Sequence, residues 1–389
     1  MKLQVNERAV LNLIETGIAT SQIQLARTLG VQPGSVNNML KRLEKTGLVY
    51  RDRIHRYGRG RPMVHFRTKR TGPILVIMWT DTHWTSGVFV DDAPRGAIQQ
   101  VESKPSANLS EVLDHLREVR DLALAQSGLR VSDLAVTVLN IDAVLTEHGR
   151  ILTSSVNPWL QQASVKDFSD ALDCKVRFDL RIPSIIPELR ARVNEGVRSL
   201  AVVVVDSGVS AHGARLDPQW GAEVFYRGEL GHVVVDPSGR VCGCGHRGCL
   251  ETVLSGPSLV RRVEADVRAG TQSSLATFVG EPPEKLFNEL ERLSKLGTDA
   301  YADTLVEDIL DRVAWSVSLV TNLIGPDVVV LSGYGLAGRD SWRERILQKA
   351  RPLTWGGEPE ASRLEFPRLK SEDYFCELAR TADRFTPQD

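Results

Sequence analysis

The sequence has no long apolar run. A membrane-spanning helix needs about 18 consecutive apolar residues or more, whereas the longest strand-like run here is LAVVVVD at residues 200–206. The opening residues, MKLQVNERAVLNLIE, show helical periodicity interrupted by polar side chains, so no secretory signal peptide is expected. A length of 389 residues with 25% charged side chains predicts a cytoplasmic globular protein of two or three domains.

Cysteines are also scarce, but they are unevenly placed. Three of the five lie within residues 242–249. In a chain without a secretion signal, such crowding favours a metal site over disulfide bonds. The other two, Cys174 and Cys376, are expected to be small buried residues without a role.

Net charge is nearly absent overall, yet the two signs are segregated. Residues 1–70 hold 14 Lys and Arg against 4 Asp and Glu, while the remaining residues hold 34 against 45. A basic segment attached to an acidic body suggests a polyanionic partner for that segment. A solvated basic face is the simpler alternative, and charge alone does not decide between them.

The basic segment begins with three short amphipathic patterns. Residues 6–16 predict a first helix that Gly17 ends, and Thr20 is a plausible N-cap for a second. A third is expected from Pro33 to Gly47. The side chains expected to face inward are Val10, Leu11, Leu13, Ile14, Ile23, Leu25, Ala26, Leu29, Val36, Met39, Leu40 and Leu43. Three helices with a tight Gly-containing turn indicate a helix-turn-helix.

The third helix keeps a set of polar residues off its apolar stripe. Asparagine can bind an adenine edge with two hydrogen bonds, and Lys or Arg can bind guanine or phosphate. The DNA-contacting residues expected from this helix are Ser35, Asn37, Asn38, Lys41 and Arg42. The alternative is an ordinary surface helix of a small helical protein.

The segment LVYRDRIHRYGRGRPMVHFR predicts two short strands around a basic loop, which is the layout of a wing. Within the loop, Arg59 and Arg61 flank a glycine and precede a proline. Such an extended, narrow segment can place two guanidinium groups in an A·T-rich minor groove. The motif resembles the core of an AT-hook, and a flexible linker is the alternative. Together, the helices and this wing predict a double-stranded DNA operator as partner.

The rest of the chain repeats one pattern of elements. Strands are expected at 74–81, 84–92 and 96–103, then a helix near 109–127 and a strand at 134–142. A second set has strands at 199–208, 210–216 and 222–228, a helix near 302–324 and a strand at 327–333. Three antiparallel strands, a helix and a strand, stated twice, are the plan of the two-lobed actin-like ATPase fold, an α/β architecture.

A glycine-rich loop carries the densest chemistry. Cys242, Cys244 and Cys249 are too close together to pair easily, but thiolates at this spacing suit tetrahedral zinc. His232 is the natural fourth ligand, and His246 inside the loop competes with it. A closed set of three cysteines and one histidine leaves no open position, so Zn²⁺ bound there would be structural.

These residues carry a family resemblance. ELGH at 229–232, followed by CGCGHRGCLE at 242–251, resembles the signature of the ROK family (repressors, open reading frames and kinases). With the helix-turn-helix, the wing and IGPDVVVLSG at 324–333, the chain resembles the N-acetylglucosamine and xylose repressor branch. The resemblance implies a winged helix-turn-helix over 1–70, a first lobe over 71–195 and a second lobe with the zinc loop over 196–389. It also implies metal ligation by His232, Cys242, Cys244 and Cys249.

The same resemblance implies that Glu229, His232 and Glu251 bind sugar hydroxyls. If one imidazole nitrogen ligates zinc, the other stays protonated and can donate to a hydroxyl, while the carboxylates accept from its neighbours. The alternative is that both glutamates are surface carboxylates that cap the loop.

The chain departs from the ROK kinases at three places. The first phosphate-binding turn is replaced by residues 79–84, which contain no glycine, and the second contains Asp206, which would repel phosphate. Where a kinase has its Asn-Asp base, alignment places Leu180 and Arg181, although a shift of one residue would bring in Asp179. Arginine cannot act as a base at neutral pH. Kinase activity is therefore not expected.

Loss of that Asn-Asp pair also changes what the sensor can bind. Arg181 could pair with a carboxylate or phosphate of an anionic effector, or it could neutralise Glu229 or Glu251 and close the pocket. The leading hypothesis is a homodimeric repressor controlled by a carbohydrate-related or anionic effector. A regulator controlled by a protein partner, and a ROK kinase with an added DNA-binding domain, are the alternatives.

Overall fold

The computed structural model describes most of the chain, with gaps. The described residues are 5–15, 21–54, 63–68, 72–79, 83–90, 93–103, 106, 108–141, 143–146, 150–154, 160–179, 185–192, 195–216, 223–355, 363–368, 374–376 and 378–379. They fall into two compact units. The first comprises residues 1–183, 218–221 and 371–389, and the second comprises residues 184–217 and 222–370. The predicted borders of the three domains stay a prediction.

The first unit begins with a winged helix-turn-helix. Its elements are α1 (Val5–Glu15), α2 (Gln22–Leu29), α3 (Pro33–Lys45), β1 (Val49–Ile54) and β2 (Met63–Thr68). The two strands pair antiparallel from Val49↔Thr68 to Ile54↔Met63, as expected for a wing. A small core forms where the helices meet, and it includes Val10, Leu25, Val36, Leu40 and Phe66.

Two predictions about α2 are wrong. Its N-cap is Ser21, not Thr20: the Ser21 hydroxyl accepts from the Gln24 N–H, and the Gln24 side chain accepts from the Ser21 N–H. Ile23 was expected to face inward but is 55% exposed. Two residues span about 200° around a helix, so a side chain two positions before the buried Leu25 points away from the core.

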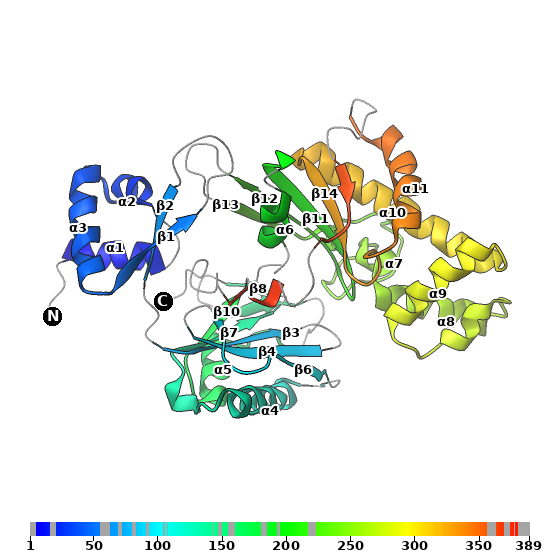
Figure 1. Cartoon of the computed structure of the whole chain (residues 1–389). Helices are drawn as coiled ribbons and strands as arrows, with labels where there is room; N and C mark the ends of the chain where they lie inside the picture. Colours follow the sequence, from blue (N-terminus) through cyan, green and yellow to red (C-terminus); the bar gives the residue numbers. More distant parts are fainter. Residues whose placement is uncertain are drawn as a thin grey trace. The chain divides into compact units, whose positions relative to one another are not determined.

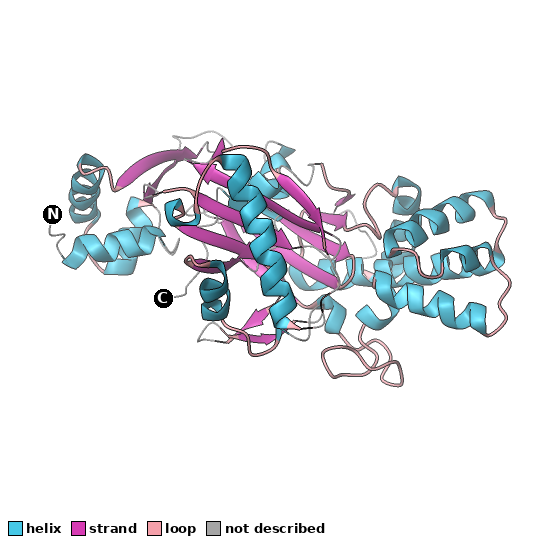
Figure 2. Ribbon diagram, turned by 90° about the horizontal axis from the view of Figure 1, so that it is seen from below, coloured by secondary structure: helices cyan, strands magenta, loops and turns pink. Residues whose placement is uncertain are grey.

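The first unit also holds a sheet of six strands in the order β10-β7-β3-β4-β5, with β6 paired to β4. Strands β3 and β4 are antiparallel, whereas β3, β7 and β10 are parallel. Figure 2 shows α4 lying across one face of this sheet. The elements are β3 (Ile74–Trp79), β4 (His83–Val90), β5 (Ala93–Pro94), β6 (Gln99–Glu102), α4 (Leu109–Ser127), η1 (Val131–Asp133), β7 (Val136–Asn140), β8 (Val144–Leu145), β9 (Ile151–Thr153), α5 (Val165–Leu172) and β10 (Val176–Asp179).

The second unit repeats this plan. Its sheet has the order β13-β12-β11-β14-β15, with antiparallel pairing through β12 and parallel pairing of β14 to both β11 and β15. The strands are β11 (Ser199–Val205), β12 (Val209–Leu216), β13 (Glu223–Gly228), β14 (Val328–Ser332) and β15 (Arg363–Glu365). The same order of antiparallel and parallel strands in both sheets confirms the duplicated actin-like architecture.

Helices of the second unit cover its sheet and form a helical subdomain. Figure 1 shows α8 and α9 side by side, next to the long α10. The helices are α6 (Ile185–Arg192), the short 3₁₀ helix η4 (Leu230–His232), α7 (Glu251–Leu254), α8 (Gly256–Arg268), η5 (Ser274–Phe278), α9 (Pro283–Leu296), α10 (Ala300–Ile324), α11 (Asp340–Ala350) and η6 (Arg351–Leu353).

Near its end, the chain contributes side chains to the first unit. Phe375, Leu378 and Ala379 are buried in the cluster that contains Ile74 and Phe89. The Phe375 and Phe89 rings lie 5.7 Å apart. Among the described residues, no helix is long and apolar enough to cross a membrane.

Candidate functional site

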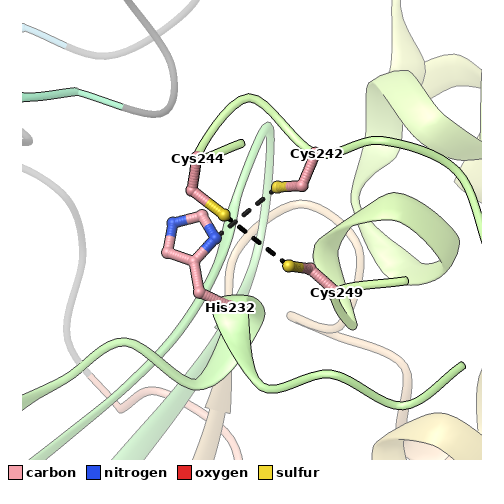
Figure 3. Close-up of side chains that lie close together, drawn as sticks. All are labelled: His232, Cys242, Cys244 and Cys249. Carbon is pink, nitrogen blue, oxygen red and sulfur yellow. Dashed lines mark hydrogen bonds between the residues drawn. The ribbon is translucent and has the colours of Figure 1, made fainter. Parts of the chain in front are cut away.

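The zinc loop follows η4 in the second unit. His232, Cys242, Cys244 and Cys249 point toward one another, and their ligand atoms all lie within 4.8 Å (Figure 3). The Cys242 Sγ lies 3.6 Å from the His232 Nδ1, and the Cys244 Sγ lies 3.6 Å from the Cys249 Sγ. Ordinary Zn–S and Zn–N bond lengths at tetrahedral angles require edges of about 3.6–3.8 Å. The donor set suits zinc, and these two distances match the edges of a tetrahedral site.

The competing histidine lies differently. The His246 Nδ1 is 3.6 Å from the Cys244 Sγ, but this imidazole is exposed and is not a member of the group of four converging donors. His232 is partly buried and brings its Nδ1 to the cluster, which leaves its Nε2 on the opposite edge of the ring. The geometry thus favours His232 as the fourth donor.

Backbone contacts hold the loop in shape. The Cys242 N–H donates to the His246 carbonyl at 2.7 Å, and the Gly248 N–H donates to the Arg240 carbonyl at 2.8 Å. Gly248 has a φ of +69°, and a Cβ there would overlap the Asp236 carbonyl oxygen. Only glycine fits this position without displacing the backbone.

Burial disfavours thiolates in this cluster unless a positive charge lies beside them. Burial raises the pKa of Cys242 to about 12, and it also raises the pKa of Cys249. Cys242 and Cys249 are 5% and 0% exposed. A divalent cation would supply the charge that these sulfur atoms need in order to ionise.

Glu251 is the first residue of α7. It contacts both the zinc loop (residues 242–249) and the turn after β11 (residues 206–208). Its Oε2 accepts from the Val209 N–H at 3.2 Å, and its Oε1 lies 3.8 Å from the Cys242 Sγ, which donates. A Cβ on Gly208 would come within 2.9 Å of the same Oε2. The Glu251 carboxylate therefore packs against the backbone of the turn and accepts one of its N–H groups. Glu229 is exposed at the N-cap of η4.

Side chains from the turn and from other segments meet at the turn after β11. Asp206 accepts from the Tyr334 N–H at 3.4 Å, and the Tyr334 hydroxyl lies 3.4 Å from the Ser207 hydroxyl. A Cβ on Gly256, at the start of α8, would overlap the Tyr334 hydroxyl. An aromatic ring and two carboxylates thus lie where a phosphate-binding turn would need open backbone N–H groups.

Tyr334 was not among the site residues predicted from the sequence. The one sequence feature near it is Gly333, which precedes it in the turn after β14. Gly333 has a φ of +86° and packs so closely on Val205 that a Cβ would overlap the Val205 carbonyl.

All five residues of α3 that were predicted to contact DNA lie among the described residues. Ser35, Asn38, Lys41 and Arg42 are exposed, and Asn37 is half-buried. The apolar side of the helix (Val36, Met39, Leu40 and Leu43) is buried, as predicted. Arg42 also donates from its Nε to Glu7 of α1 at 2.7 Å. No sequence motif predicted this partner.

Residues 82–364 match the ROK family, and residues 3–59 match the MarR family. The ROK match spans well over half of the chain. The chain belongs to the ROK family. The DNA-binding transcriptional repressor Mlc of Escherichia coli K12 is 24% identical over 351 residues, which cover 84% of this chain and 80% of Mlc. Glucokinase of Thermotoga maritima is 30% identical, but over only 33% of this chain and 39% of the enzyme.

Among solved structures, a ROK family transcriptional regulator described as a homologue of the E. coli Mlc protein superposes with a TM-score of 0.62. It shares 20% identity and covers 98% of this chain and 96% of that one. This likeness shows the fold: a winged helix-turn-helix joined to a two-lobed ROK body.

Several predicted site residues of this ROK protein lie outside the described residues. They are Arg59, Arg61, Leu180 and Arg181, together with residues 80–82 of the first turn. Their roles stay predictions. The alternative base, Asp179, ends β10 and is 4% exposed, and its carbonyl accepts from the Ile141 N–H.

Proposed function

We propose that the chain is a DNA-binding transcription repressor of the ROK family, with α3 as its recognition helix. The observation that carries the proposal is the exposed polar face of α3 on a winged helix-turn-helix that precedes a ROK body. The similarity to the repressor Mlc over most of both chains supports it. The half-site contacts expected from one such domain are few, so we propose that the regulator binds DNA as a homodimer.

The metal is proposed to be structural Zn²⁺ held by His232, Cys242, Cys244 and Cys249. Three sulfur donors and one nitrogen donor are a common structural zinc set, and the spacing of the donors supports it. Bound there, zinc would supply the positive charge that lets the thiolates form, and it would fix the loop that precedes α7.

The body is proposed to have no kinase activity. Asp206 and Glu251 bring two carboxylates to the turn after β11, and the Tyr334 hydroxyl contacts Ser207 there. Negative charge and an aromatic ring at this turn oppose binding of nucleotide phosphates.

The effector is proposed to be a small carbohydrate-related or anionic molecule that contacts Glu229, His232 and Glu251. With Nδ1 on the metal, the His232 Nε2 would be protonated and available to donate to a hydroxyl. Glu251 already accepts from Val209, so it offers less free acceptor capacity than the family pattern implies. Arg181 completes the proposed set.

Two assays test these proposals. A gel shift at fixed salt concentration, with genomic fragments from around the gene for this chain, should show at least one retarded fragment, and absence of any shift would refute DNA binding. Thermal-shift screening with sugars, sugar phosphates and sugar acids should give a stabilising compound whose effect disappears in Glu229→Ala. A panel without stabilising compounds would refute the small-effector proposal and favour control by a protein partner.

A further inference from the structure

An ion pair joins the proposed recognition helix to the first helix of the winged domain. The Arg42 Nε lies 2.7 Å from the Glu7 Oε1, and the two residues are 35 positions apart in the chain. Glu7 lies in the first turn of α1, and its side chain is only 8% exposed. The Arg42 side chain is 55% exposed. A buried carboxylate is therefore paired with a guanidinium group that faces solvent.

Burial of Glu7 makes this contact persistent. A carboxylate withdrawn from water loses free energy unless a charged partner and hydrogen bonds replace the water. Arg42 supplies that partner through its Nε, the guanidinium nitrogen nearest the helix. Across the described residues, Arg42 has no second ion pair or hydrogen bond, so its two terminal nitrogens stay available.

Holding the Nε orients the whole guanidinium group. This group is planar, and its remaining donors form a fork that matches two oxygens of a phosphate. A free surface arginine loses side-chain entropy when it binds, whereas an arginine already held by a carboxylate loses less. Arg42 is thus pre-organised for a two-point contact.

The position of Arg42 along α3 indicates which part of DNA it reaches. Seven residues are nearly two helical turns, so Arg42 lies on the same face as Ser35. Arg42 is nine residues after Pro33, which is about 13.5 Å along the helix. A recognition helix contacts base edges with its N-terminal residues. Arg42 lies beyond that part of α3, so a phosphate is its expected partner.

We propose that Glu7 is a positioning residue that fixes the Arg42 guanidinium to bind one DNA phosphate through its Nη1 and Nη2 atoms. The contact would set the register of α3 in the groove without selecting any base. The inference rests on the proposed DNA-binding function. Removal of the acidic Glu7 should therefore weaken DNA binding. Simple Coulomb repulsion between Glu7 and DNA predicts the opposite, that binding tightens.

The test uses the full chain and fluorescence anisotropy. The probes are two unrelated duplexes of about 30 base pairs, selected by the wild-type protein from a randomised pool, and one scrambled duplex. The variants are Glu7→Ala, Glu7→Gln, Arg42→Ala, Arg42→Lys and the double alanine variant. Glu44→Ala is the matched control, because it breaks the Arg51–Glu44 pair (2.6 Å) in the same domain.

We expect Glu7→Ala and Arg42→Ala each to weaken binding about 10-fold, equally on both selected duplexes. The double variant should be no weaker than either single one, because the two residues act as a unit. Arg42→Ala should reduce the salt dependence by about one phosphate contact, while Arg42→Lys should keep the salt dependence but lose affinity. Glu44→Ala should bind as the wild type does, or more tightly.

Three outcomes would overturn the proposal: unchanged or tighter binding by Glu7→Ala, additive losses in the double variant, or a loss confined to one duplex, which would assign Arg42 to a base. If Glu7→Ala does not fold, the proposal is judged on Glu7→Gln and on Arg42→Ala, which changes an exposed side chain. A wild-type protein that selects no duplex refutes the proposed function itself, which separates that failure from failure of this inference.

Discussion

At the residue scale, the zinc loop and the turn after β11 share one side chain. Glu251 contacts the backbone of the turn through Oε2 and the Cys242 thiol through Oε1. Glu251 therefore links the cysteine loop directly to the turn. The family signature predicted the four side chains that converge in the loop, but it did not predict that Glu251 accepts from the Val209 N–H, because such a contact depends on the fold.

Loss of one zinc ligand should remove the metal and destabilise the second unit. We expect Cys249→Ser to bind no stoichiometric zinc and to lower the free energy of unfolding by roughly 3 kcal/mol or more, since metal binding contributes directly to folding. Mass spectrometry of metal content and thermal unfolding measure the two effects. Cys376→Ser, which changes a half-buried cysteine far from the loop in sequence, is the control. Full zinc content in Cys249→Ser would contradict the assignment.

The filled turn gives a prediction about nucleotides. The wild-type chain should not bind a fluorescent ADP analogue, because the Asp206 carboxylate would repel phosphate and the Tyr334 hydroxyl lies beside Ser207 in the turn. Fluorescence titration with and without Mg²⁺ measures this, and a ROK kinase provides the positive control. Saturable binding that an excess of ADP displaces would show that the turn is open in solution.

At the element scale, the regular elements were predicted well because their patterns are local. The buried face of α3 follows from apolar periodicity, and burial of the strands β3, β7, β11 and β14 follows from their continuous apolar runs. Contacts between distant segments were not predictable in this way. Phe375 reaches the sheet of the first unit, and Glu7 reaches Arg42, without a local signal in the sequence. Ile23 shows the limit of periodicity in a helix of only eight residues.

The long helix α10 begins at a strong N-cap. Asp299 accepts from the N–H groups of Ala302 and Ser274 and from the Ser273 hydroxyl. Burial alone would raise the pKa of Asp299, but these hydrogen bonds outweigh burial and lower its pKa. The cap therefore stabilises the fold above the pKa of an unfolded aspartate, about 3.9, and this contribution disappears as pH falls through the lower folded pKa.

Replacing this cap should give a pH-dependent loss. Asp299→Ala is expected to lower the free energy of unfolding by about 1–2 kcal/mol at pH 7, and by progressively less as the pH falls below about 4. Asp299→Asn keeps a capping oxygen but cannot ionise, so it should lose less at pH 7. Urea unfolding across this pH range measures both. An equal loss at every pH would show that the charge of Asp299 contributes nothing.

At the scale of the whole molecule, the chain combines a winged helix-turn-helix with a duplicated ROK body. Both parts could be predicted from the sequence. The wing and the zinc motif are each continuous segments, and the same succession of strands occurs twice along the chain. Charge segregation agrees with this division, since the basic residues concentrate in the first 70 positions. The effector set was less predictable, because Arg181 depends on an alignment without a local motif.

The central claim is that the chain binds particular DNA sequences, and selection from a randomised duplex pool tests it most directly. We expect the full chain to enrich duplexes with inverted-repeat symmetry and to bind them at least about 1,000-fold more tightly than a scrambled duplex at physiological salt. We also expect that Asn38→Ala lowers this preference, while Glu44→Ala does not. A pool that stays random after selection, or equal affinity for the selected and scrambled duplexes, would contradict the account.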